Sequence, residues 1–175
     1  MEQRAFLEDF ADAVRGVLAG GGATTEAIWS LGPHLQRLRT HPGLPPLLEA
    51  AAEEGAPLYR DPDEAFVLGY ARFGPDHVTP VHSHGGWGLL CLLSGEDHYT
   101  SWRSDDGSLT LVQDHHLRPN DLAYWFPAPY NVHRQAAGPD GTTELVLHQG
   151  DGRRVHEFDL ETGEARPAPR PERRA

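Results

Sequence analysis

The stretch from residue 57 to 165 constrains the fold most strongly. It is a succession of short segments rich in β-branched and aromatic residues, separated by turn-forming sequences such as Asp-Asp-Gly and Gly-Pro-Asp-Gly. The segments read AFVLGYARF, WGLLCLLSGE, HYTSWR, SLTLVQ, DLAYWF, TELVLHQ and VHEFDL. Strands of this length and spacing are typical of an antiparallel sandwich or barrel. We therefore predict a mainly β domain over residues 57–165.

The region before this domain has helical periodicity. Residues 6–18 place Phe6, Phe10 and Val14 on one face, and a glycine run follows. Two more helices are predicted, one over 24–40 with an interruption near a proline, and one opened by the prolines of PPLLEAAAEE. We expect these helices, within residues 1–56, to form a cap that packs on the β domain.

The composition excludes some classes of partner and indicates where the protein is located. The formal net charge is -11, and a strongly acidic chain is unsuited to nucleic acid or to an anionic membrane surface. The first residues contain no long apolar stretch, so we expect a cytoplasmic protein. We also expect it to be a monomer or a homodimer. Cys91 lies in an apolar run and is predicted to be a buried core residue. The Pro- and Arg-rich residues 166–175 are predicted to be disordered.

The most informative motif is His82-Ser83-His84. On a β-strand, residues i and i+2 point to the same face, so the two imidazoles would project together. Their spacing suits two ligands of one metal ion, and Ser83 would point the other way. Eleven histidines in 175 residues favour a metal site.

A second segment, NDLAYWFPAPYNVHRQ, combines a strand, a proline-rich turn and a histidine, His133. Together the two segments resemble the two motifs of the cupin superfamily. The residues that carry this resemblance are Gly74, His82, His84, Gly95, Pro127 and His133. The resemblance implies a jelly-roll barrel with N-terminal helices, and a metal ion inside it held by His82, His84 and His133.

One departure from the cupin pattern narrows the chemistry. Gly88 stands where most cupins carry a glutamate ligand, which leaves three neutral imidazoles. Such a set suits Fe(II), Cu(II), Ni(II) or Zn(II), and does not suit Mg²⁺ or Ca²⁺. Within the superfamily it resembles the thiol dioxygenases, the cysteine dioxygenase family. That resemblance implies an Fe(II) cofactor, with O2 and a small thiol as substrates and a sulfinic acid as product.

The same resemblance suggests residues around the metal. Arg60, after Tyr59, matches the arginine that binds the substrate carboxylate, and Arg72 is the alternative anchor. His148 matches a histidine that donates a hydrogen bond beside the metal ligands. Trp87 is the best candidate for a pocket wall, and Tyr130 is a second one.

The sequence constrains the identity of the substrate less than it constrains that of the metal. The family's Ser-His-Tyr triad would fall on Val146, His148 and Gly150, so only the histidine is present. We expect a small thiol that carries a carboxylate. Cysteine stays open, and the missing tyrosine favours another thiol, such as mercaptopropionate, mercaptosuccinate or the bulkier ergothioneine. Two other functions stay open: a three-histidine cupin that cleaves C–C bonds of diketones, and a non-catalytic cupin that binds a metal or a small molecule. His115 and His116 are predicted to lie solvated in a turn.

Overall fold

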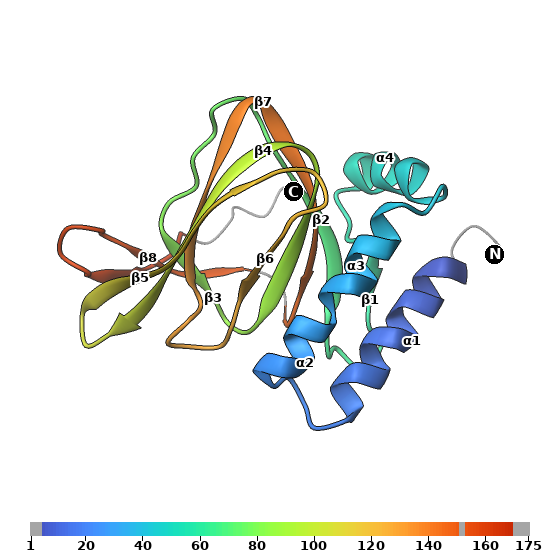
Figure 1. The fold of residues 1–175 in the computed structure, drawn as a ribbon, viewed down its shortest axis with the longest axis horizontal. Coiled ribbons are helices and arrows are strands. Elements are labelled where there is room, and N and C mark those ends of the chain that lie inside the picture. Colours follow the sequence, from blue (N-terminus) through green and yellow to red (C-terminus); the bar gives the residue numbers. More distant parts are fainter. Residues whose placement is uncertain (1–4, 151–152, 170–175) are drawn as a thin grey trace.

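A computed structural model describes residues 5–150 and 153–169. Its strands form one antiparallel nine-stranded sheet that curls into a barrel, and the N-terminal helices lie along one side of that barrel (Figure 1). The predicted fold class, a mainly β jelly-roll barrel with N-terminal helices, is confirmed. No helix in the described ranges has the length and apolar character needed to cross a membrane.

The helices occur where the sequence predicted them. They are α1 (Ala5–Ala19), α2 (Thr25–Ser30), α3 (Gly32–Arg39) and α4 (Leu44–Glu54). Thr24 caps α2, because its hydroxyl accepts a hydrogen bond from the Ala27 backbone N–H (3.2 Å). The expected interruption falls at Leu31, and Pro33 occupies the first turn of α3, where proline costs no hydrogen bond.

The strands follow in chain order and pair mostly out of order. Their bounds are β1 (Tyr59–Arg60), β2 (Val67–Phe73), β3 (His82–His84), β4 (Gly88–Asp105), β5 (Ser108–Leu117), β6 (Leu122–Trp125), β7 (Val132–His148), β8 (Arg154–Phe158) and β9 (Ala165–Pro167). The sheet order is β1-β2-β7-β3-β8-β9, and β4 pairs with β5, β6 and β7. Because β9 pairs with β8, the predicted disorder is wrong for Arg166 and Pro167; residues 170–175 lie outside the described part.

Two predicted turns do not separate strands. The segments predicted at 87–96 and 98–103 join into β4, and the Gly-Pro-Asp-Gly sequence lies inside β7. The pairing of β4 with β7 shifts register at two points, where β-bulges accommodate the extra residues of one strand. Gly141 has φ of 71°, and a Cβ there would lie 2.5 Å from the Phe73 carbonyl oxygen. Glycine is therefore used to bend a continuous strand at this point, which a turn pattern cannot distinguish from a chain reversal.

The sheet separates two apolar regions. One face of β4 and β7 packs under the helices and forms a single core with them, which includes Leu35 of α3, Leu89 and Leu147. Alternate residues of the same strands point into the barrel, among them Leu90 and Leu92. The helices thus cover the outside of the barrel, and its interior remains for a site.

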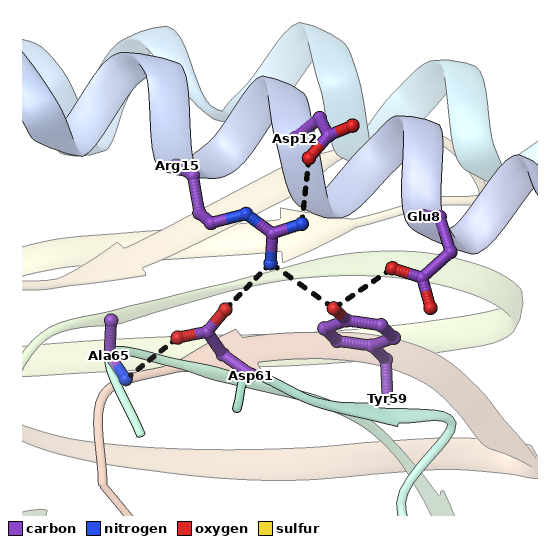
Figure 2. A network of polar contacts seen from close by, with 6 residues as sticks. All are labelled: Glu8, Asp12, Arg15, Tyr59, Asp61 and Ala65. Carbon is purple, nitrogen blue, oxygen red and sulfur yellow. Dashed lines mark hydrogen bonds and ion pairs between the residues drawn. The ribbon is translucent and has the colours of Figure 1, made fainter. Parts of the chain in front are cut away.

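A polar network ties α1 to β1 (Figure 2). Arg15 donates to Asp61 Oδ1 (2.8 Å) and to the Tyr59 hydroxyl (3.1 Å), and Tyr59 in turn donates to Glu8 (3.1 Å). Asp61 is only 1% exposed, so this ion pair is partly removed from water. Tyr59 and Asp61 both face the helix, and strand alternation therefore turns the intervening Arg60 to the opposite side.

Candidate metal centre

His82 and His84 of β3 and His133 at the start of β7 come together inside the barrel. The backbone pairs His82 directly with His133, and one ligand atom from each ring lies within 4.8 Å of the others. His82 is 4% and His133 1% exposed. The prediction that these three histidines form one cluster is confirmed.

The hydrogen bonds of two rings direct their other nitrogens toward each other. His82 Nδ1 lies 2.8 Å from the Pro80 carbonyl oxygen, and His84 Nδ1 lies 3.2 Å from that of Arg153. A carbonyl only accepts, so both Nδ1 atoms carry the proton and both Nε2 atoms present a lone pair. These Nε2 atoms are 3.1 Å apart. A cation bound between them would remove the repulsion, and backbone carbonyls commonly orient metal-binding histidines in this way.

The surroundings keep the imidazoles of His82 and His133 neutral. Burial lowers the pKa of His82 to about 4, and nearby His84 lowers it further. Burial also holds the pKa of His133 well below its usual value. Neutral imidazole is the form that binds a metal, so this donor set fits Fe(II) and its softer neighbours.

Trp125 of β6 occupies the place of the missing carboxylate. Its ring centroid lies 4.9 Å from that of His133 and 5.3 Å from that of His84. Gly88 pairs with Trp125 across β4 and β6, and a Cβ at Gly88 would lie 2.0 Å from the indole ring. No side chain fits at position 88 unless Trp125 moves. The absence of a carboxylate ligand is therefore part of the packing at this site.

The histidines open onto a cavity of about 750 Å³. His148 lines it together with the three histidines, and its Nδ1 donates to the Gln149 carbonyl (3.3 Å). Arg153 and Arg154 also line the cavity and are its arginines among the described residues. Arg154 is close enough that its charge contributes to lowering the pKa of His82.

Other predicted residues lie elsewhere. Arg60 is exposed and does not line this cavity, and neither does Arg72. Trp87 is 1% exposed and belongs to the core under the helices, so it forms no pocket wall. Tyr130 lines a separate, mainly apolar cavity of about 410 Å³ beside Trp29. The structure therefore does not bring these four predicted residues to the metal centre.

The sequence analysis missed a buried polar cluster in the same barrel. Gln135 and Glu144 of β7 line the cavity, and Asp97 of β4 adjoins them. Glu144 is 1% and Asp97 2% exposed. A carboxylate that alternates with apolar residues along a strand is visible in TTELVLHQ, but its direction depends on the register.

A second group of histidines, on β4 and β5, lies outside this centre. His115 and His116 belong to β5, so their predicted placement in a turn is wrong, although both are exposed as expected. His98 of β4 stacks on His116, with ring centroids 4.4 Å apart, and contacts Asp114 at 2.6 Å. Cys91 is fully buried, as predicted, and burial raises the pKa of its thiol to about 11.

No protein-family profile matches the sequence. Similar solved structures include the DMSP lyase DddQ from Ruegeria pomeroyi, at 19% identity over 50% of this chain and 40% of the lyase, with a TM-score of 0.40. The cupin domain of Cnp3 from Schizosaccharomyces pombe has 14% identity over 55% of this chain and 59% of that domain, with a TM-score of 0.42.

Oxalate oxidase in complex with the substrate analogue glycolate is also similar, at 18% identity over 52% of this chain and 45% of the oxidase, with a TM-score of 0.45. The aligned part spans less than two thirds of each of these three chains. These low-identity similarities identify no substrate.

Proposed function

We propose that the protein is a dioxygenase that uses Fe(II) and O2 to convert a small thiol to its sulfinic acid. The observation that carries the proposal is the all-histidine donor set with an indole ring in place of a carboxylate. The three ligands are neutral, so they leave the charge of a divalent ion uncompensated. A thiolate supplies a negative charge that this donor set lacks.

His82, His84 and His133 would hold the metal. When bound, Fe(II) supplies the Lewis acidity that lowers the pKa of a thiol and the redox chemistry that activates O2. The protein's own contribution is to keep the imidazoles neutral and oriented, and to exclude water with the Trp125 ring. His148, on the wall of the same cavity, is placed to hydrogen-bond a ligand near the metal.

The cavity arginines replace Arg60 as candidate anchors for an anionic group of the substrate. Arg154 contacts Glu157 at 3.2 Å, and its side chain is 44% exposed, so it can turn toward a carboxylate at the mouth of the cavity. Its backbone pairs with His84, which places the anchor one strand from a metal ligand. A charge-assisted pair at this position would orient the substrate relative to the metal.

The test is O2 consumption by the iron-loaded protein with a panel of thiols, with sulfinate measured by mass spectrometry. Uptake accompanied by one sulfinate per O2 supports the proposal. If O2 is consumed with diketones but with none of the thiols, the protein would instead be a dioxygenase that cleaves C–C bonds. No uptake with either class, at full iron loading, would leave a binding protein and refute the proposal.

A further inference from the structure

Gln135 and Glu144 line the same cavity as the three histidines and form a buried polar cluster with Asp97. The Gln135 side-chain nitrogen donates to Asp97 Oδ2 (3.0 Å) and to both carboxylate oxygens of Glu144 (2.9 Å each). One amide group, with two hydrogens, therefore serves three acceptor atoms. Both carboxyl groups are almost completely buried.

Neither Asp97 nor Glu144 forms an ion pair with an arginine in the part of the chain that the structure describes. The strand neighbours of Glu144 are Ala71 and Leu92, which carry no charge. Asp97 Oδ1 is buried and has no hydrogen-bond partner, nor does Thr142 Oγ1, on the strand beside Glu144. Among the described residues the donor to Glu144 is the single amide of Gln135, so burying this carboxyl group in its ionised form is costly unless a further donor or a cation is supplied.

The distance from this pair to the metal centre suits a small ligand. Gln135 is two residues from His133 on β7, and both side chains line the cavity, so their Cα atoms are about 7 Å apart by the strand rise. Glu144 is one hydrogen bond further along. Gln135, Glu144 and the histidines line one cavity, so a ligand bound at the histidines can reach Glu144 with its opposite end.

We propose that Glu144, supported by Gln135, binds a positively charged amino group at the end of the substrate remote from the metal. The inference rests on the proposed function, because it assigns the thiol to the histidine end. The substrate class is then an aminothiol, with any carboxylate directed toward Arg154. An ammonium group would donate hydrogen bonds to the carboxyl oxygens and stabilise the ionised form of Glu144, which burial disfavours in the absence of a ligand.

A purely structural role for the cluster makes a different prediction. If Gln135 only bridges two strands through Asp97 and Glu144, then loss of either carboxylate should weaken the barrel, and binding should decrease equally for all thiols. If Glu144 contacts the ligand, only its loss should change which thiols bind. Asp97 is the matched control because it shares the network and does not line the cavity.

The experiment measures binding to the iron-loaded protein without oxygen, by calorimetry. The probes are α,ω-aminothiols with two to six methylenes, each matched with the hydroxythiol of equal length. We expect one chain length to bind at least tenfold more tightly as the aminothiol than as the hydroxythiol. Glu144→Gln should abolish this preference, and Asp97→Asn should retain it.

Three outcomes would overturn the inference: no preference in the native protein, an unchanged preference in Glu144→Gln, or equal loss in both variants. Alkylammonium ions that stabilise the metal-free protein thermally, and fail to stabilise Glu144→Gln, provide a reading that needs neither iron nor a thiol. If no thiol supports O2 uptake and this thermal effect persists, the proposed function fails and the role of Glu144 stands. If thiols are oxidised but aminothiols bind no more tightly than hydroxythiols, the proposed function stands and the role of Glu144 fails.

Discussion

Glu144→Gln should change how the stability of this protein depends on pH. Burial raises the pKa of Glu144 from an ordinary 4.5 to about 8 in the folded protein, and nearby Asp97 raises it further. The folded state therefore binds more protons than the unfolded state between these two values. The stabilisation is fully present below the unfolded pKa and is lost as pH rises through the folded pKa. Glutamine mimics the protonated form and cannot lose this proton.

The magnitude follows from the linkage relation. For a folded pKa of about 8, raising the pH from about 6.5 to about 8.5 should lower the free energy of unfolding by about 2 kcal/mol through Glu144 alone. The window avoids the buried histidines, because their lowered pKa values affect stability below about pH 6.5. It also ends below the ordinary pKa of a thiol, 9.0, above which the raised pKa of Cys91, about 11, begins to affect stability.

The assay is urea unfolding of the metal-free protein, followed by tryptophan fluorescence at several pH values in this window. The native protein should lose stability across it, and Glu144→Gln should lose about 2 kcal/mol less. Asp97→Asn serves as a comparison, because the pKa of Asp97 is also raised by burial and its loss should lower that of Glu144. Parallel pH dependence in the native protein and Glu144→Gln would refute the assignment of a buried, protonated carboxyl group.

Three further predictions concern the metal centre and its cavity. Replacing any one of the three ligand histidines by alanine should sharply reduce iron content, measured by elemental analysis; full iron in all three variants would contradict the ligand set. Gly88→Ala should force Trp125 to move and lower the free energy of unfolding by about 1–3 kcal/mol, which thermal or urea unfolding would detect. Arg154→Ala should raise KM for a carboxylated thiol by roughly tenfold and leave a neutral thiol unchanged. Arg60→Ala is the matched control and should change neither value, since Arg60 lies outside the cavity.

The three-histidine cluster could be predicted from the sequence, the His82–His84 pair because its geometry is local and His133 through the resemblance to the cupin motifs. A His-x-His on any strand projects both rings to one face, and His133 follows a short strand and a proline-rich turn. The helices were predictable for the same reason, since amphipathic spacing, the Thr24 cap and the prolines act within a few residues. Even the missing carboxylate at Gly88 was visible as a departure from a pattern.

The other residues around the histidines could not be predicted, because their positions depend on strand register and packing, which are decided by contacts between distant segments. Arg60 lies beside a tyrosine and two aspartates in the sequence, yet Arg15 of α1 pairs with Asp61, and Arg60 is exposed and does not line the cavity. Glu144 lies in an ordinary strand sequence, and the bulges between β4 and β7 help set the register that turns it into the barrel. The indole of Trp125 contacts the histidines because β6 pairs with β4 at Gly88. The sequence by itself thus determined which residues can bind a metal, whereas only the tertiary structure decided which side chains surround it, because strand faces invert with a one-residue shift.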